Sequence, residues 1–322
     1  MTGTATTWTG TRRTRWRPRG SAAPGFDRPP ILDRLPVGSG DGVGLNIFEA
    51  VLLGAIEGIT EFLPISSTGH LTIVEKLLGY QLDDPDIVAF TAIIQSGAVL
   101  ATTIFLRRDI ARIVPAWFRG VFSKDRRDDA DYRFGWAVIL GSIPIILVGF
   151  AFKDTIETTL RSLWFVAASL ILFSAVMAFA DRAATQVRHE DDVTWKDTLI
   201  IGVTQCLALV PGVSRSGATM CAGLLRDFDR VTVTKLSFFL SIPALLGATV
   251  LQTVKEAGNI SAGVGWGPTI VATLTSFVVG YAAVAWLLKF ISKHSYSIFI
   301  AYRLVLGALL MVLLATGAIE AK

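Results

Sequence analysis

Six apolar stretches of membrane-spanning length limit the folds that are open to this chain. Each is uncharged or nearly so and reaches the roughly 20 residues that a helix needs to cross a bilayer core. Only 17% of all residues are charged, against about 25% in soluble domains. The sequence therefore predicts an all-α integral membrane protein with six transmembrane helices. They are expected at Val88–Leu106, Phe134–Phe152, Ser162–Ala180, Ser237–Val254, Pro268–Leu288 and Ile298–Ile319.

Two further apolar segments are interrupted by polar residues and do not fit the spanning template. Residues Leu45–Leu63 end at Pro64, and residues Leu199–Val213 contain the pair Pro211-Gly212; a second short apolar stretch follows each break. Non-helical backbone at membrane depth must be buried in protein or face water. A half-helix, a polar break and a second half-helix therefore predict two re-entrant helix hairpins.

The two interrupted segments resemble each other. A shift of 148 residues places Ser66–Gly69 on Ser214–Gly217 and Glu57 on Gln205. Three predicted spans follow each segment, and an odd number of spans inverts the second copy, so we expect an inverted-topology repeat whose broken helices meet near the midplane. The two copies are expected at about 45–180 and about 198–320.

Residues 1–44 differ in composition from the rest of the chain. They are rich in Thr, Gly, Pro and Arg and show no apolar periodicity, so we expect a basic, disordered tail. A single membrane domain is expected at 45–322.

The loop charges predict an orientation. Sixteen Lys and Arg lie in the loops at 107–133, 181–197, 224–235 and 289–293, against five on the other side. The positive-inside rule then predicts that these loops are cytoplasmic and that both termini lie outside the inner (plasma) membrane. The tail, with seven Arg, then lies outside too, which conflicts with the rule.

Charged residues within apolar segments cost free energy, so their presence indicates a functional or structural role. Glu57 and Glu61 are four residues apart, so they share one face of a helix. They could bind a divalent cation or transfer a proton, or they could belong to a structural polar network between helices. Arg303, near the start of the sixth stretch, is expected to snorkel or to find a structural partner.

Polar residues at the first break are suited to an anion. Hydroxyls in the run Ser66–His70 are ordinary helix N-caps, but the same geometry directs backbone N–H groups and the positive end of the helix dipole at a ligand. His70 could take or give a proton near neutral pH, or it could be structural.

The second break carries an arginine inside an apolar hairpin. Arg215 needs an anion, either a protein carboxylate or a ligand, and a phosphate fits its guanidinium well. Together the two breaks suit a phosphate or diphosphate at a membrane site, held through a metal ion.

At this point the motifs resemble those of a known family. The run Glu57–His70 (EGITEFLPISSTGH) is similar to the first signature of the undecaprenyl-diphosphate phosphatases, and Pro211–Thr219 (PGVSRSGAT) is similar to the second. The resemblance covers nearly the whole chain from about residue 45. It implies hydrolysis of a C55 isoprenoid diphosphate to its monophosphate, which recycles the lipid carrier of peptidoglycan synthesis and underlies bacitracin resistance. It also implies a divalent cation, Mg or Ca, and a site that faces the extracytoplasmic side.

The resemblance carries over to individual positions. The residues that match the family's catalytic residues are Glu57, Glu61, Ser67, His70 and Arg215. Substrate-binding positions are Ser66, Thr68, Ser214, Ser216 and Thr219, and the metal ligands are Glu57 and Glu61. The nucleophile stays open between Ser67 and a water activated by a carboxylate or by His70.

A second function remains open at this point. Inverted repeats with broken helices also build transporters, so the alternative is a transporter or flippase of a lipid phosphate. The expected partners are a polyprenyl diphosphate and the lipid bilayer, with no nucleic acid; a homodimer is left open.

Overall fold

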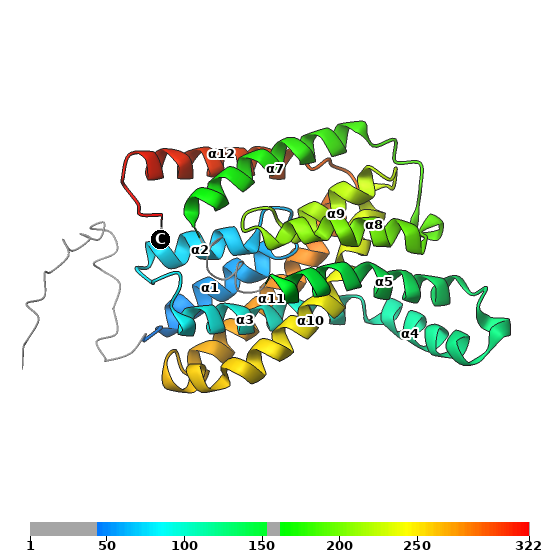
Figure 1. The fold of residues 1–322 in the computed structure, drawn as a ribbon, viewed down its shortest axis with the longest axis horizontal. Helices are drawn as coiled ribbons and strands as arrows, with labels where there is room; N and C mark the ends of the chain where they lie inside the picture. The colour runs from blue at the N-terminus through cyan, green and yellow to red at the C-terminus, as the bar shows by residue number, and fades with distance from the viewer. Residues whose placement is uncertain (1–43, 153–161, 322) are drawn as a thin grey trace, which may run out of the picture. The chain divides into compact units, whose positions relative to one another are not determined.

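The computed structural model describes residues 44–152 and 162–321, and in these residues every regular element is a helix. Six of the helices are long and apolar enough to cross a membrane, and each overlaps one predicted stretch. The predicted all-α fold with six spans is therefore confirmed, whereas the predicted tail lies almost wholly outside the described residues. The six are α3 (Pro85–Phe105), α5 (Ala130–Ala151), α7 (Leu163–Ala183), α10 (Arg230–Ala262), α11 (Trp266–Ile291) and α12 (Ser297–Ala315) (Figure 1).

The two interrupted segments form two pairs of short helices. The first helix pair consists of α1 (Ile47–Thr60) and α2 (Ser67–Leu77). The second helix pair consists of α8 (Trp195–Gln205), the short 3-10 helix η3 (Cys206–Leu209) and α9 (Arg215–Leu224). In both pairs the chain leaves the helix where the sequence predicts a break.

The first helix of each pair starts with the same kind of cap. Before α1, the Asn46 side chain accepts from the Glu49 N–H at 2.9 Å, and the Glu49 carboxylate accepts from the Asn46 N–H at 3.0 Å. Thr194 and Asp197 form the same reciprocal capping box before α8, 148 positions later. These boxes satisfy backbone donors that a helix start leaves free, and so fix where both helices begin.

Glycines let the first helix of each pair approach a spanning helix closely. A Cβ on Gly54 of α1 would collide with the Ala272 carbonyl of α11, and a Cβ on Gly202 of α8 would collide with the Gly141 carbonyl of α5. Gly54 and Gly202 are again 148 positions apart. Equivalent glycines therefore let α1 pack on α11 and α8 pack on α5.

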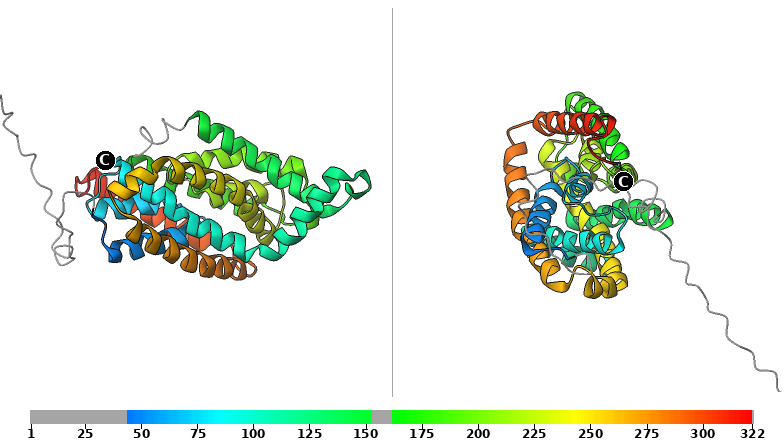
Figure 2. Two further views of the ribbon diagram at one scale, coloured as in Figure 1. Left: turned by 90° about the horizontal axis from the view of Figure 1, so that it is seen from below. Right: turned by 90° about the vertical axis from the view of Figure 1, so that its left-hand side faces the viewer.

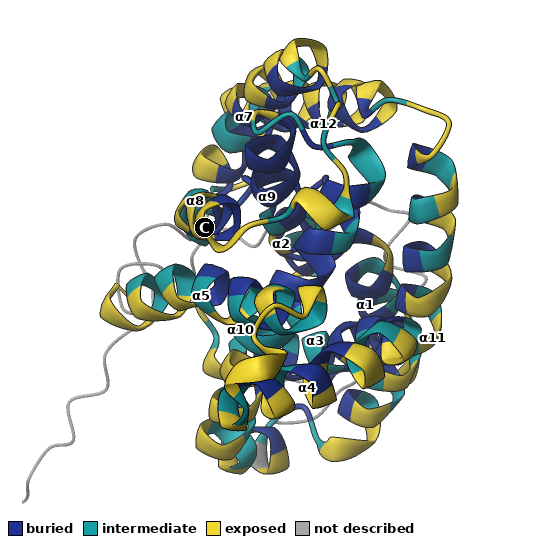
Figure 3. Cartoon of the chain, turned by 90° about the vertical axis from the view of Figure 1, so that its right-hand side faces the viewer, coloured by how far each residue is buried: buried dark blue, intermediate teal, exposed yellow. Residues whose placement is uncertain are grey.

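The other spanning helices enclose these pairs. Helices α7 and α12 pack against each other, as Figure 1 and the right-hand view of Figure 2 show, and α3 packs against both α10 and α11. In α9 every residue from Ser216 to Leu224 is buried, whereas the spanning helices expose residues on their outer faces (Figure 3). Helix α9 thus lies in the protein interior, whereas α8 of the same pair exposes Ile200 and Val203.

The predicted loop at 107–133 is mostly helical, which corrects the sequence interpretation. Helix α4 (Arg107–Phe122) and the 3-10 turn η1 (Lys124–Arg126) occupy it, and a second 3-10 turn, η2 (Glu190–Asp192), precedes α8. Helix α4 buries Ile113, Ala116 and Gly120, and it packs on α5. The four arginines of α4, at 107, 108, 112 and 119, lower the average hydrophobicity of this segment, so its apolar face is not evident from the sequence.

Candidate active site

Both breaks end at a serine with an unusual backbone conformation. Ser66 has a φ of 76° and Ser214 a φ of 71°, a sign that is uncommon for residues other than glycine. The Ser66 hydroxyl accepts from the Gly69 N–H at 3.3 Å, and the Ser214 hydroxyl accepts from the Gly217 N–H at 3.2 Å. Each serine is the N-cap of the helix that follows, so α2 and α9 begin with the same local geometry.

Arg303 of α12 ties the two breaks together. Its side chain is fully buried, and it donates to the Pro64 carbonyl at 3.3 Å and to the Gly212 carbonyl at 2.9 Å. Pro64 and Gly212 occupy equivalent positions in the two motifs, 148 residues apart. A direct bond from the Ser216 hydroxyl to the Leu63 carbonyl, at 2.9 Å, adds a second link. The structural pairing expected for Arg303 is confirmed.

An ion pair joins the two motifs at the same place. The Arg215 guanidinium donates from Nη2 to Oε1 of Glu61 at 2.7 Å. The other carboxylate oxygen of Glu61 accepts a short hydrogen bond from the Ser67 hydroxyl. Glu61 therefore connects a cation from the second helix pair with a hydroxyl from the first.

Several polar atoms beside this ion pair have no partner among the described residues. Nε and Nη1 of Arg215 are buried without an acceptor, and Oε1 of Glu57 is buried without a donor. Buried polar groups are normally hydrogen-bonded, and an unpaired one is costly. Two free donors on a guanidinium fit an anion, and a free carboxylate oxygen fits a cation or a proton.

A cleft gives access to these groups. A cavity of about 150 Å³ is lined by Glu61, Ser67 and Arg215, and an adjoining cavity of about 330 Å³ is lined by Glu57. Both cavities share several lining residues, so we treat them as one cleft. The shared residues are Ser67, Thr68, Gln95, Ala208, Leu209 and Pro211.

The structure brings most of the predicted site residues to this cleft. Those that line it are Glu57, Glu61, Ser66, Ser67, Thr68, Ser214 and Arg215. Ser216 and Thr219 do not line it: the first bonds to Leu63, and the second bonds to the Ser237 hydroxyl at 2.7 Å. Their hydroxyls hold the second helix pair in place.

His70 also lies outside the lining of the cleft. Its Nδ1 is 2.7 Å from the Ser66 carbonyl, and its Nε2 is 2.7 Å from the Tyr302 hydroxyl. The carbonyl can only accept, so Nδ1 carries a proton, and Nε2 of the neutral ring accepts from Tyr302. In this arrangement both ring nitrogens are engaged, and a catalytic role for His70 stays a prediction.

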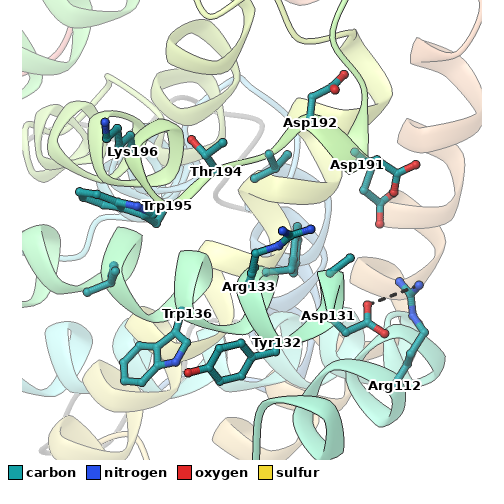
Figure 4. A pocket seen from close by; sticks show the side chains of 15 residues that line it. Arg112, Asp131, Tyr132, Arg133, Trp136, Asp191, Asp192, Thr194, Trp195 and Lys196 are labelled. Carbon is teal, nitrogen blue, oxygen red and sulfur yellow. Dashed lines mark ion pairs between the residues drawn. The ribbon is translucent and has the colours of Figure 1, made fainter. Parts of the chain in front are cut away.

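A larger cavity lies elsewhere. It has a volume of about 860 Å³ and lies between the start of α5 and the η2–α8 segment (Figure 4). Its charged groups include Arg112 and Asp131, which are 3.4 Å apart. No residue that lines it has a buried side-chain polar atom without a partner in the described part of the chain. We therefore assign the chemistry to the smaller cleft.

Comparison with known proteins adds to this geometry. A family model described as "Bacitracin resistance protein BacA" matches residues 50–309. The chain belongs to the BacA family. Among curated relatives, "Undecaprenyl-diphosphatase 3" of Frankia casuarinae is 66% identical over 277 residues, covering 86% of this chain and 100% of the relative. "Undecaprenyl-diphosphatase" of Cutibacterium acnes is 51% identical with the same coverage, and "Undecaprenyl-diphosphatase 1" of Streptomyces avermitilis is 52% identical, covering 86% and 99%.

The BacA model covers every residue assigned to the cleft. Sequence reasoning from the two motifs missed two residues of this region, Gln95 and Tyr302. Gln95 lies in the wall common to both cavities, and Tyr302 bonds to His70. A signal for Gln95 was available, because an amide inside an apolar span needs a polar partner or a water-filled cavity.

Proposed function

We propose that this BacA-family chain hydrolyses undecaprenyl diphosphate to undecaprenyl phosphate and inorganic phosphate, and so recycles the lipid carrier of peptidoglycan synthesis. The observation that carries the proposal is Arg215, whose buried Nε and Nη1 have no acceptor among the described residues, in a cleft that Glu61 and Ser67 also line. A guanidinium fork binds phosphate oxygens in pairs. The names of the relatives supply the identity of the lipid.

A hydrolase explains the cleft better than a lipid transporter. The relatives reported above are named as diphosphatases. A transporter needs to bind and release its cargo, but it does not need a hydroxyl that is hydrogen-bonded to a carboxylate. Ser67 and Glu61 form such a pair, as in sites where a base activates a nucleophile.

Within this proposal the Ser67 hydroxyl is the nucleophile. Its oxygen attacks the terminal phosphorus while Glu61 accepts its proton. The new bond from Oγ to phosphorus forms as the bond from this phosphorus to the bridging oxygen breaks, and undecaprenyl phosphate leaves with that oxygen. Water then attacks the phosphorus of the phosphoserine, and the bond from Oγ to phosphorus breaks as the bond to the water oxygen forms. One proton of the water restores the Ser67 hydroxyl, inorganic phosphate leaves, and the proton on Glu61 leaves with the products.

Arg215 stabilises the negative charge that develops on the phosphate oxygens during the reaction. Its bond to Glu61 fixes the plane of the guanidinium, so the two free donors are directed before the substrate arrives. Donors that are oriented in advance stabilise developing charge without the cost of reorganisation. This role also explains why the arginine comes from the second helix pair, opposite the nucleophile.

A divalent cation, Mg or Ca, is part of the proposal. Glu57 offers a buried oxygen without a partner among the described residues, and each oxygen of Glu61 accepts one hydrogen bond and keeps a second lone pair. In the described residues no group of three His, Cys, Asp or Glu could hold a metal by itself. Mg²⁺ is often held by one or two carboxylates together with substrate phosphates, so Glu57 and Glu61 fit a cation that binds with the diphosphate. Such a cation neutralises charge on the phosphates.

The proposal includes an inverted repeat of two re-entrant hairpins. The equivalent capping boxes, glycine contacts and N-cap serines, all 148 residues apart, support it. An extracytoplasmic opening is supported by the wall of the cleft at Val88–Gln95 of α3 and at Ala248–Gln252 of α10. Under the charge-based orientation, both segments belong to the outer halves of their helices.

Phosphate release tests the function. Purified protein in detergent should release phosphate from undecaprenyl diphosphate, and Ser67→Ala should abolish both this release and any phosphoserine trapped by rapid quenching. Full turnover by Ser67→Ala would mean that water, and not Ser67, attacks the phosphorus. Absence of release by a folded wild-type protein with Mg²⁺ or Ca²⁺ would rule out the function itself.

Thiol labelling tests the orientation. Both native cysteines are first replaced by alanine, and single cysteines are then placed at Lys124, Val187 and Gln81. An impermeant reagent applied to intact cells should label position 81 and spare positions 124 and 187. The opposite pattern would reverse the orientation.

A further inference from the structure

The cleft continues past its polar groups to an apolar end. The part that contains Glu61 and Arg215 is also lined by Ile145 of α5, Leu245 of α10 and Leu209 of η3. None of these three side chains can bind a phosphate. This end of the cleft is therefore suited to hydrocarbon.

The two helices that flank the apolar end pack closely in their first halves. The Ser142 hydroxyl of α5 donates to the Leu240 carbonyl of α10 at 3.4 Å. The rings of Phe134 and Phe239 lie 5.1 Å apart, and a Cβ on Gly141 would lie only 2.7 Å from the Leu240 side chain. On this side of Ser142 the pair α5–α10 is closed.

In their second halves the same helices are largely unburied. No residue of α5 from Ile143 to Ala151 is buried, and between Ile242 and Val254 of α10 only Thr249 is. Leu147 is 64% exposed and Val250 61% exposed.

The change occurs at the same short sequence in both helices. Helix α5 contains Ser142–Pro144 and α10 contains Ser241–Pro243, both reading Ser-Ile-Pro. A proline inside a helix removes one backbone hydrogen bond and bends the chain. A proline at this level in each helix accounts for the loss of packing between the two helices beyond it.

Helices α7 and α12 behave differently. Leu163 and Leu314 belong to one buried cluster at one end of this pair, and Arg303 bonds to Ser174 further along. This pair is packed at both levels, so loss of contact in the second half is a property of α5 and α10 and not of every helix pair at the bilayer surface.

We propose that the prenyl chain of the substrate leaves the cleft between the second halves of α5 and α10, past Leu209, and enters the outer leaflet there. The inference rests on the proposed function, which supplies a lipid diphosphate. The Ser142–Leu240 contact closes the opposite direction between these two helices, so the chain runs toward their second halves while its diphosphate stays at Arg215.

Adjacent residues of the same type provide matched variants. Ile145→Trp and Leu245→Trp narrow the opening from either side. Ile146→Trp and Leu246→Trp make the same chemical changes one position along, where the side chains are 48% and 37% exposed and do not line the cleft. Leu245→Phe is a milder substitute if a tryptophan variant fails to fold, as judged by its Tm.

The measurement compares two substrates on the full chain. Undecaprenyl diphosphate needs the opening, whereas isopentenyl diphosphate has a single isoprene unit and does not reach it. Binding and kcat/KM for the long substrate should fall by about tenfold or more in Ile145→Trp and Leu245→Trp, because displaced isoprene units lose buried apolar contact. The short substrate should be unaffected, and both control variants should match the wild type with both substrates.

Two outcomes would overturn the proposed path. One is an equal loss for both substrates, which would mean that the residues act on the diphosphate. The other is an equal effect of the cleft-facing and control variants. Should the wild type bind the lipid without releasing phosphate, the proposed hydrolysis would fall, while the ratios of binding constants would still decide the path.

Discussion

The two helix pairs share a backbone and differ in their side chains. Capping boxes, glycines and N-cap serines recur at the same spacing in both. The positions that would carry chemistry do not recur. Each such position holds one residue in the first pair and another in the second: Glu57 and Gln205, Glu61 and Leu209, Ser67 and Arg215, and His70 and Ala218.

This difference suggests a division of roles. The first pair contributes carboxylates and a hydroxyl, and the second contributes the cation and, at the position equivalent to Glu61, the apolar Leu209 of the cleft wall. Carboxylates at both equivalent positions of the second pair would add negative charge beside a diphosphate. The same backbone arrangement therefore serves two roles. In the first pair it carries the reacting groups, and in the second pair it binds the anion and, in our proposal, the start of the lipid chain.

The largest loss of stability is expected when the link between the two helix pairs is removed. Arg303→Met should lower stability by on the order of 3 kcal/mol, because it leaves the buried Pro64 and Gly212 carbonyls without their donor. The Tm in detergent measures this loss, and turnover should fall with it. Arg303→Lys should recover little, since an ammonium lacks the fork that reaches both carbonyls. A Met variant as stable as the wild type would mean that Arg303 does not join the breaks.

The next largest effect removes the acid from the first pair. Glu61→Gln should lower turnover by about a hundredfold or more, because an amide can neither accept the Ser67 proton nor neutralise Arg215. Glu49→Gln, the same substitution in α1 but outside the cleft, is the control and should stay within a few-fold of wild type. The assignment of Glu61 would be lost if a folded Gln variant turned over normally.

The sequence predicted the spans, the breaks and the principal residues of the cleft, but not how they are joined. Long apolar stretches and breaks that contain proline are local signals, so the six spans and the interruptions could be read directly. The Arg303 bonds to Pro64 and Gly212 join residues far apart in the chain, and no local pattern encodes them. The same holds for Gln95, which reaches the cleft only because α3 packs beside the first helix pair. Helix α4 was missed because charge masked its apolar face.

A smaller effect tests the cation of the second pair. Arg215→Lys keeps the charge but loses the two free donors of the fork, so kcat/KM should fall by about tenfold. Stability should change less than in Arg215→Ala, which leaves the buried Glu61 carboxylate unpaired. Full activity of the Lys variant beside an unstable Ala variant would mean that Arg215 only neutralises Glu61.

The smallest effect compares the two capping boxes. Glu49 has neutral partners, Asn46 and the Tyr80 hydroxyl, whereas Asp197 binds both Arg188 and Arg226. Gln also serves in a capping box, so Glu49→Gln should barely change the Tm. Asp197→Asn should lower it clearly at pH 7, because two arginines lose their carboxylate.

The pH dependence of the Tm should show the same asymmetry. Burial alone would raise the pKa of Asp197, but hydrogen bonds from Arg188 and Thr194, and from Arg226, hold this pKa below its ordinary value. A group whose pKa is lower in the folded state stabilises the fold above its unfolded pKa, about 3.9 for Asp. That stabilisation is lost as the pH falls, from about pH 5 downward. The wild-type Tm should therefore drop over this range, and the Tm of Asp197→Asn should drop less, while Glu49→Gln follows the wild type. Parallel curves for wild type and Asp197→Asn would show that the arginine-bound box does not set the acid sensitivity of the second helix pair.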